Sequence, residues 1–469
     1  MMRTITVILL IAACAVAAGC SQTGQPAGST PAVAPAAAPQ APPGLVTPDN
    51  LTTVVKEAVA YAKANGREKA LAAFNDPEGP FVRNGVYVFS ESYDGTALAE
   101  PFEQGLVGTN IRNMTDRYGV PLVKNLEETA GFGIGFVSYD YPDPDDAGTI
   151  GPKLSVVADV DGTYYVGAGA YAGSGRVYPS TGIGPATRAY TTADLTAFVN
   201  GAAAYAARNG KTAALLAFND PKGQFADGEL AIIAADYNST VLANGITPGT
   251  ANDHINLLNY HDPDGVTTIR EMRDLARQGG GFSYTVAAVT RNNRTWYAPK
   301  IDYAVPVDDT YWIFSGIIVP EYEQLRGGNV TGLPVRNHTR TELYDLVHRA
   351  AASARENGKE ETLAKINDPA GPFVDGDLFV WAEDFNGTVL ADPYWKAGIG
   401  KTWMDYTDPY GAKTTVVSIN AIRSGTGFTH GMYPDTSANQ TVPIPKLMYM
   451  ERVDDTWWIG SGIYGVQQA

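Results

Sequence analysis

Residues of the types that carry catalysis are scarce in this chain of 469 residues, and they lack the spacing of catalytic motifs. The five histidines include no His-Glu-x-x-His pair, and no Gly-x-Ser-x-Gly elbow presents a nucleophilic serine. Gly460, Gly462 and Gly465 have the spacing of a dinucleotide fingerprint, but no helix is predicted after them, so we interpret them as a strand end. We therefore predict that the protein is not an enzyme and uses no cofactor.

Potential metal ligands are also few. The two cysteines, Cys14 and Cys20, lie in the first twenty residues, which leaves the folded part without a disulfide or a cysteine metal site. The acids between Asp140 and Asp146 could suggest a calcium loop, but they lack the glycine and terminal glutamate of an EF-hand. We favour a solvated acidic loop there and expect no metal site.

Composition limits the class of protein and of partner. Hydrophobic residues make up 44% of the chain, enough for packed cores, and the length corresponds to roughly three domains of about 150 residues. Lys and Arg number 34 against 50 for Asp and Glu, a net charge of −16 that repels phosphate backbones. We therefore expect no nucleic-acid partner.

The N-terminus has the pattern of an export signal. Arg3 precedes the apolar run 7–16, and Ala-Ala-Gly follows just before Cys20. This pattern predicts a lipoprotein signal peptide over 1–20, lipidation of Cys20 and a place on the outer face of the cell membrane. An ordinary signal peptide that ends near a cysteine is the alternative. Residues 21–48 are rich in Pro and Ala and are predicted to form a linker.

An internal repeat indicates which elements position any binding residues. The motif Asn-Asp-Pro recurs at Asn75, Asn219 and Asn367, with offsets of 144 and 148 residues. Upstream of each, apolar residues at helical spacing predict an amphipathic helix that ends in Asn-Gly, and a second short helix follows. Two helices are therefore expected before any strand.

The rest of each repeat is predicted to be an antiparallel sheet. Hairpin turns are indicated at Asp94-Gly95, Asn238-Ser239 and Asn386-Gly387. Further turns follow at Asp116, Asp262 and Asp408, and Pro-Lys pairs at 152–153, 299–300 and 445–446 are expected to open strands. The predicted fold class is α+β, with two helices packed on about five strands in each repeat.

These motifs, in this order and spacing, resemble the single Cache domain, type 2. The resemblance is carried by Gly387 to Ala391 with Asp408 to Gly411, by Asp262 to Phe282, and by the closing Pro-Lys strand pairs. It implies three tandem copies, over 49–180, 190–327 and 338–469. Each copy would have a long helix on a PAS-like sheet and would bind a small organic ligand outside the membrane.

The resemblance also implies which residues form ligand pockets. In the first copy they are Tyr87, Glu100, Tyr139, Tyr141 and Lys153; in the third they are Phe379, Asp392, His430, Tyr433 and Lys446. Such a set gives aromatic walls with hydroxyl groups and an ammonium that can fix an anionic group. The alternative for each residue is ordinary sheet core, with the lysine reaching solvent.

Two departures from the family pattern bear on the ligand. Family members often have His where this chain has Glu100, Asn244 and Asp392. An acid there would favour a cationic or amphoteric ligand, or would neutralise the nearby lysine. The second copy lacks the tyrosine-proline element and reads Thr-Val-Ala after Tyr284. It is the copy that we expect to be structural.

We therefore predict a lipid-anchored, extracellular sensor or capture protein without its own output domain, which passes a signal to a membrane partner. A structural or adhesive surface protein with Cache-like spacers is the main alternative, and an enzyme without known motifs is the third. Eight Asn-x-Ser/Thr sequons suggest a glycosylated archaeal surface protein, although a Thr-rich composition explains them equally well.

Overall fold

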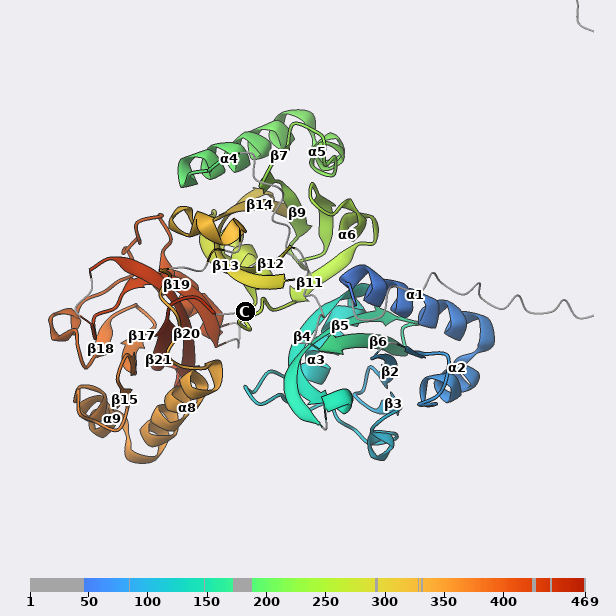
Figure 1. The fold of residues 1–469 in the computed structure, drawn as a ribbon, viewed down its shortest axis with the longest axis horizontal. Coiled ribbons are helices and arrows are strands. Elements are labelled where there is room, and N and C mark those ends of the chain that lie inside the picture. The colour runs from blue at the N-terminus through green and yellow to red at the C-terminus, as the bar shows by residue number, and fades with distance from the viewer. Residues whose placement is uncertain are drawn as a thin grey trace, which may run out of the picture. The chain divides into compact units, whose positions relative to one another are not determined.

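The structure is a computed structural model that describes residues 46–467 except 84, 147, 172–187, 292–293, 328, 330–331, 424–426 and 439–440. The predicted signal peptide, Cys20 and most of the linker lie outside the described residues. The described part forms three successive modules that share the order of their main helices and strands (Figure 1): module 1 (46–171), module 2 (188–327) and module 3 (332–467). Among the described helices, none has the length and apolar character needed to cross a membrane.

Each module begins with the predicted pair of helices. They are α1 (Pro48–Asn65) and α2 (Arg67–Phe74), α4 (Thr192–Asn209) and α5 (Lys211–Phe218), and α8 (Arg340–Asn357) and α9 (Lys359–Ile366). Thr47, Thr191 and Thr339 start the long helices with capping boxes. Gly66 ends α1 and starts α2 at φ 80° and ψ 160°, a positive φ that glycine adopts readily.

An antiparallel five-stranded sheet follows in each module. Module 1 has β2 (Val86–Ser92), β3 (Ala97–Ala99), β4 (Ile134–Asp143), β5 (Thr149–Asp159) and β6 (Tyr164–Tyr171); module 2 has β9 (Ile233–Asp236), β10 (Val241–Asn244), β12 (Gly281–Arg291), β13 (Arg294–Asp308) and β14 (Tyr311–Ile318); module 3 has β17 (Trp381–Asp384), β18 (Val389–Ala391), β19 (Phe428–Pro434), β20 (Pro443–Arg452) and β21 (Trp457–Tyr464). The strand orders β3-β2-β6-β5-β4, β10-β9-β14-β13-β12 and β18-β17-β21-β20-β19 are equivalent. The α+β prediction is confirmed, although the Pro-Lys pairs lie inside their strands rather than at their starts.

Short elements complete the modules. They are the strands β1 (Val82–Arg83), β7 (Ala226–Asp227), β8 (Leu230–Ala231), β11 (Ile255–Asn259), β15 (Val374–Asp375) and β16 (Leu378–Phe379), the helix α6 (Pro248–Asn252), and the 3-10 turns η1 (Gln104–Leu106), η2 (Pro144–Asp146), η3 (Pro320–Gly327) and η4 (Lys396–Gly398). β11 of module 2 pairs in parallel with β4 and extends the module 1 sheet. This pairing ties the segment after β10 to the neighbouring module.

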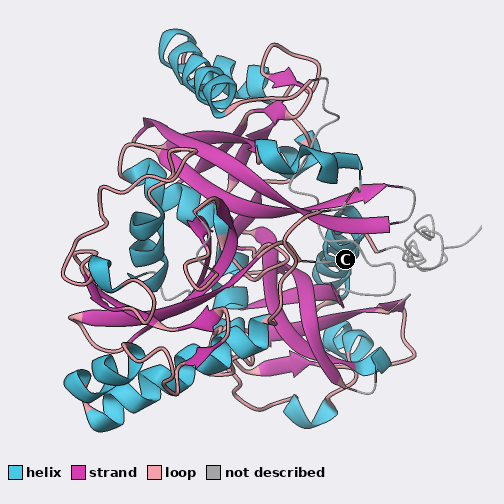
Figure 2. Ribbon diagram, turned by 60° about the vertical axis from the view of Figure 1, so that its left-hand side comes forward, coloured by secondary structure: helices cyan, strands magenta, loops and turns pink. Residues whose placement is uncertain are grey.

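A third helix in each module was not predicted. These helices are α3 (Leu122–Gly131), α7 (Thr268–Arg277) and α10 (Thr414–Arg423). In module 1, Phe136, Val156 and Val166 pack with α1 and α2, whereas Val137 and Tyr165 pack with α3. Strand alternation therefore gives each sheet one face for the long helix and one for the third helix, and helices flank the strands in Figure 2.

Candidate ligand-binding site

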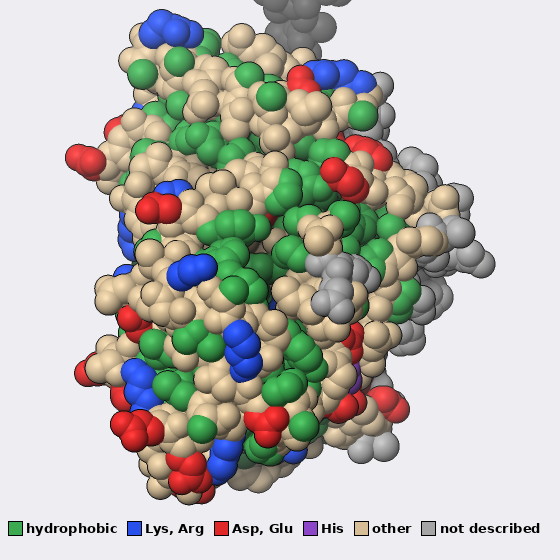
Figure 3. All heavy atoms as spheres, turned by 90° about the vertical axis from the view of Figure 1, so that its left-hand side faces the viewer, with side chains coloured by type: hydrophobic (Ala, Val, Ile, Leu, Met, Phe, Trp, Pro, Cys, Tyr) green, Lys and Arg blue, Asp and Glu red, His purple; other side chains and the backbone are tan. Residues whose placement is uncertain are grey.

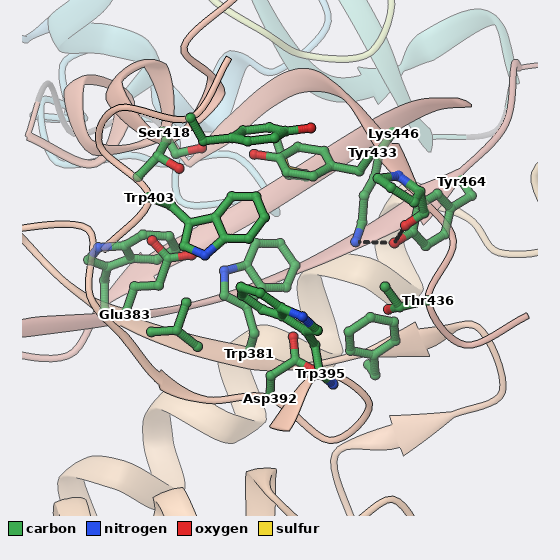
Figure 4. Close-up of a pocket in the computed structure, with 17 residues that line it drawn as sticks. Trp381, Glu383, Asp392, Trp395, Trp403, Ser418, Tyr433, Thr436, Lys446 and Tyr464 are labelled. Atoms are coloured by element: carbon green, nitrogen blue, oxygen red, sulfur yellow. Dashed lines mark hydrogen bonds between the residues drawn. The ribbon is translucent and has the colours of Figure 1, made fainter. Parts of the chain in front are cut away.

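Module 3 contains a cavity of about 330 Å³ between its sheet, α10 and the segment 392–406. Figure 4 shows its lining, which is Phe379, Trp381, Glu383, Val389, Asp392, Trp395, Trp403, Tyr406, Thr415, Ser418, Tyr433, Pro434, Thr436, Lys446, Met448, Trp458 and Tyr464. Strand alternation explains the choice of residues. Phe379, Trp381 and Glu383 face the cavity, while Val380 and Ala382 between them pack in the core of α8.

Lys446 is the buried cation of this cavity. Its Nζ donates to Tyr464 Oη at 2.9 Å and lies 4.2 Å from the centre of that ring and 4.8 Å from the Trp381 ring. Burial lowers the pKa of the ammonium to about 8, against the opposing effect of Asp392. Lys446 therefore retains a positive charge at neutral pH in a wall built of aromatic rings.

Two carboxyl groups also line the cavity. Asp392 Oδ1 accepts the backbone N–H groups of Tyr394 and Trp395 at 2.8 and 2.7 Å, which fixes the turn that carries Trp395. Glu383 is 9% exposed, and burial raises its pKa to about 8. At neutral pH the Glu383 side chain is therefore largely the neutral acid.

The equivalent region of module 1 is closed by its own side chains. The register of the sheets makes Tyr139, opposite Lys153, the counterpart of Gly431, opposite Lys446. The Tyr139 ring is buried, and its hydroxyl hydrogen-bonds Ser155 Oγ at 2.8 Å. A Cβ on Gly431 would instead meet the Tyr433 ring at 2.6 Å.

The residues predicted for the first pocket do come together, but as a packed cluster. Lys153 is 2% exposed and donates to Tyr87 Oη at 2.7 Å. Its Nζ lies 4.4 to 5.4 Å from four ring centres, those of Tyr87, Phe89, Tyr141 and Tyr171. Tyr141 donates to Glu103, and burial raises the pKa of Glu100 to about 8.

Module 2 neutralises its lysine internally. Lys300 Nζ lies 2.6 Å from Asp302 Oδ1, and both side chains are buried. The cavity beside them is about 70 Å³, room for little more than water. These observations favour the structural role expected for this module.

One predicted site residue lies elsewhere. His430 is adjacent to Gly431 on β19, so the alternation of the strand turns its ring away from the cavity. Its Nε2 lies 2.8 Å from Asp262 Oδ2 of module 2, and neither residue is exposed. Asp140 is also not solvated as expected, because it forms an ion pair with Arg340 at 2.8 Å.

Phe379, Asp392, Tyr433 and Lys446 were predicted and do line the cavity, whereas most of its wall was not predicted. The missed residues include Trp381, Glu383, Trp395, Trp403 and Trp458. A signal was present, because four of the seven tryptophans of the chain fall at these positions of the third repeat. Within the described ranges, no three His, Cys, Asp or Glu side chains are grouped to hold a metal ion.

The family model described as Single Cache domain 2 matches residues 54–174 and 342–466, which make up just over half of the chain. The chain belongs to the single Cache domain 2 family. Cache domains are extracellular modules that sense small molecules, and they are ligand-binding rather than catalytic domains. Module 2 lies between the matched ranges and shares the strand order of its neighbours.

Several solved structures are similar to parts of this chain. A methyl-accepting chemotaxis protein from Vibrio parahaemolyticus shares 22% identity over 27% of this chain and 87% of its own, with a TM-score of 0.24. A Cache chemosensory domain solved for carboxylic acid recognition shares 18% over 27% and 88% (TM-score 0.23). The ligand-binding domain of the Pseudomonas fluorescens chemoreceptor CtaA with L-isoleucine shares 13% over 57% and 82% (TM-score 0.16). No curated protein matches the chain.

Proposed function

We propose that module 3 binds a small organic molecule in its cavity, and that the protein acts outside the cell as a lipid-anchored sensor or capture component. The observation that carries this proposal is the cavity of about 330 Å³ that Lys446 lines. Small-molecule sites in proteins have volumes of about 300 to 1,000 Å³, apolar walls and a few convergent polar groups. The module 3 cavity has all three properties.

The lining indicates the chemistry of the ligand. Eight of the seventeen lining residues are aromatic, while Lys446, Asp392 and Glu383 supply both signs of charge or hydrogen bonding. A purely anionic ligand would meet two carboxyl groups, and a purely cationic one would meet the lysine. The lining therefore suits a small molecule that carries an apolar body and either amphoteric groups or a cationic group placed away from Lys446, as expected from the acid at position 392.

Lipid anchoring through Cys20 and a separate membrane partner for the signal are part of the proposal. The sequence Ala-Ala-Gly before Cys20 supports the anchor. On the face of the protein in Figure 3, acidic and basic side chains are interspersed with hydrophobic ones. Cys20→Ser is expected to leave the protein unprocessed or released from membranes; retention of normally cleaved protein in the membrane fraction would contradict the anchor.

A spacer function has specific support in modules 1 and 2. The predicted pocket of module 1 is packed with its own side chains, and the lysine of module 2 is paired with Asp302. The proposal therefore assigns binding to module 3 and a supporting role to the other two. A structural role for the whole protein would not account for the cavity in module 3.

Tryptophan fluorescence and thermal melting of the intact protein, screened against a library of small metabolites, test the proposal. Four tryptophans line the cavity, so any occupant is expected to change the emission as well as raise the melting temperature. The response should be lost or weakened in Lys446→Met and kept in Lys153→Met, the variant at the same register position of module 1. A hit that depends on Lys153 instead, or a library without any hit, would refute binding by module 3.

A further inference from the structure

Glu383 has an arrangement that packing alone does not explain. It is the third cavity-facing residue of the run Phe379, Trp381 and Glu383, and it is 9% exposed. Trp381, two residues before it on the same face of the strand, acts to lower the pKa of the carboxyl group, whereas Oε2 has no hydrogen-bond partner in the described structure. A buried carboxyl oxygen without a partner is costly, so a protein retains one where something else satisfies it.

Module 1 shows how the same position is satisfied internally. Glu91 has the register position of Glu383, since Glu91 pairs with Tyr165 and Glu383 pairs with Trp458. The Tyr165 hydroxyl donates to Glu91. In module 3 the indole of Trp458 donates to the backbone oxygen of Asp384 at 3.2 Å, so the cross-strand donor is lost. The carboxyl group of Glu383 faces a cavity instead.

The charges of the cavity decide what can reach Glu383. In Figure 4, Glu383 lies at one end of the labelled residues, and Lys446 and Tyr464 lie at the other. A positive group is repelled from the Lys446 end and attracted to a carboxylate at the Glu383 end. Trp381 lies two residues before Glu383, Trp458 is paired with Glu383 across the ladder, and indole rings can stabilise cations.

We propose that the Glu383 end of the module 3 cavity binds a protonated amine, which donates an N–H to the free carboxyl oxygen. This inference rests on the proposed function and names the polar group of the ligand. A quaternary ammonium would lack the N–H donor, and a carboxylate would place two acids together. The ammonium donates a hydrogen bond to the free carboxyl oxygen, and the aromatic rings of the wall stabilise its positive charge.

Binding should release a proton. The free acid has a pKa of about 8, raised by burial, so it is mostly protonated at pH 7. An entering ammonium keeps its own proton and stabilises the carboxylate, and the carboxyl proton goes to the buffer: COOH plus ammonium gives carboxylate, ammonium and H⁺. The affinity should therefore rise with pH, by up to about tenfold per unit between pH 6 and 8.

Matched probes test the inference on the intact protein. Two skeletons are used, each as amine, alcohol and carboxylate: phenylethylamine, phenylethanol and phenylpropionate, and propylamine, propanol and butyrate. Tryptophan fluorescence and thermal melting should respond best to an amine. Glu383→Gln should weaken amine binding at least tenfold, while Glu91→Gln, the matched variant in module 1, should leave it unchanged.

Other outcomes overturn the inference. Amine binding that is equal in Glu383→Gln would do so, as would binding of the carboxylates alone or no response to either amine. If Glu383→Gln does not fold, calorimetry of the unaltered protein in buffers of different ionisation enthalpy decides: the inference requires release of close to one proton at pH 7. Carboxylate binding that needs Lys446 would refute the amine yet leave the proposed function intact, whereas a negative metabolite screen would remove the function itself.

Discussion

Each of the three modules has a lysine at the same register position, but the surroundings of its charge differ. Lys153 is enclosed by four aromatic rings, Lys300 is paired with Asp302, and Lys446 borders a cavity. The surrounding sheets have the same strand order, so the framework does not cause the difference. A few neighbouring side chains decide whether this face of the sheet is a packed core or lines a cavity.

The comparison of modules 1 and 3 identifies these side chains. Where module 1 has Tyr139 hydrogen-bonded to Ser155, module 3 has Gly431 and Met448 at the same register positions. In module 3 the Tyr433 ring and Met448 lie beside Gly431, and both line the cavity together with four tryptophans. A conserved framework can thus convert a packed module into a hollow one through local exchanges.

The largest expected effect comes from Tyr139→Gly, which gives module 1 the residue found in module 3. The change removes a buried ring, leaves the Ser155 hydroxyl without its partner and puts glycine into a strand. We expect a loss of about 4 to 6 kcal/mol in the free energy of unfolding of this module. Chemical denaturation followed by circular dichroism measures it.

The reverse change is the matched control. Gly431→Tyr with Met448→Ser gives module 3 the pair found in module 1, and the new ring should push the Tyr433 ring, which lines the cavity, into it. Binding of any cavity ligand should then be lost while the protein stays folded. A ligand that still binds this double variant would show that the cavity is not the site.

The next prediction contrasts two lysines at the same register position. Lys300→Met leaves Asp302 buried without its counter-charge and should destabilise module 2 by about 3 to 5 kcal/mol. Lys446→Met removes a charge whose burial is costly, since burial lowers the lysine pKa from 10.5 to about 8, and should stabilise module 3 by up to about 3 kcal/mol. Thermal melting of both variants measures the opposite signs.

The pH dependence provides a check on Lys446. Between pH 8 and 10.5 the unfolded lysine still binds a proton that the folded one has released, so the stability of the wild type should rise with pH in this window. Lys446→Met should show a smaller rise, because burial lowers the pKa of Lys153 to about 8 as well and this lysine still contributes. A variant that is less stable than the wild type at pH 7 would show that the ammonium is better solvated than its burial indicates.

The sequence predicted the parts of the fold that depend on local signals. Helix caps, Asn-Gly ends and hairpin turns are encoded in short segments, so the two helices and the sheet of each repeat were found. The helix α10 was missed because Thr414 and Thr415 favour strands as much as helices. Helix α7 could have been found, since Ile269, Met272 and Ala276 have helical spacing.

The candidate ligand-binding site was predicted only in part, because its formation depends on packing between distant segments. Lys446 and Tyr433 followed from the family pattern, but the closure of module 1 by Tyr139 depends on its contact with Ser155, which the sequence does not show. His430 was wrongly predicted to line the pocket, because it lies on the face of β19 opposite the cavity and contacts Asp262 of module 2. The sequence does not show this contact between modules.

A further prediction concerns His430, which lies on the face of β19 opposite the cavity. His430 lies 2.8 Å from Asp262 and 3.8 Å from Asp264, and it also interacts electrostatically with Arg336 and Glu271. Its pKa is raised by the two aspartates, although burial acts to lower it. A raised histidine pKa gives stability that is fully present below the unfolded pKa of 6.5 and is lost as the pH rises through the folded value. His430→Gln should therefore cost about 1 to 2 kcal/mol at pH 6 and less at pH 9.

Melting temperatures across this pH range measure the effect of His430. The control is His348→Gln, because His348 is an exposed partner of Glu451 at 3.0 Å and such a pair is worth under about 1 kcal/mol. Equal effects of the two variants, or a larger effect of His430→Gln at pH 9, would show that the buried pair does not hold modules 2 and 3 together as a charged pair.

The smallest expected effect concerns the hairpin turn, where module 2 differs from both neighbours. Gly95 and Gly387 have φ of 83° and 71°, whereas module 2 has Ser239 at φ 67°, a region that costs a residue with a Cβ about 1 kcal/mol. The Ser239 hydroxyl is also buried and lacks a hydrogen-bond partner in the described structure. Ser239→Gly removes both costs and should raise the stability of module 2 by about 1 kcal/mol. Gly387→Ser should have the opposite effect, because its Cβ would meet Met404 Cγ at 2.8 Å. Thermal melting distinguishes the two signs, and a destabilised Ser239→Gly would mean that the greater freedom of glycine in the unfolded chain outweighs the strain in the turn.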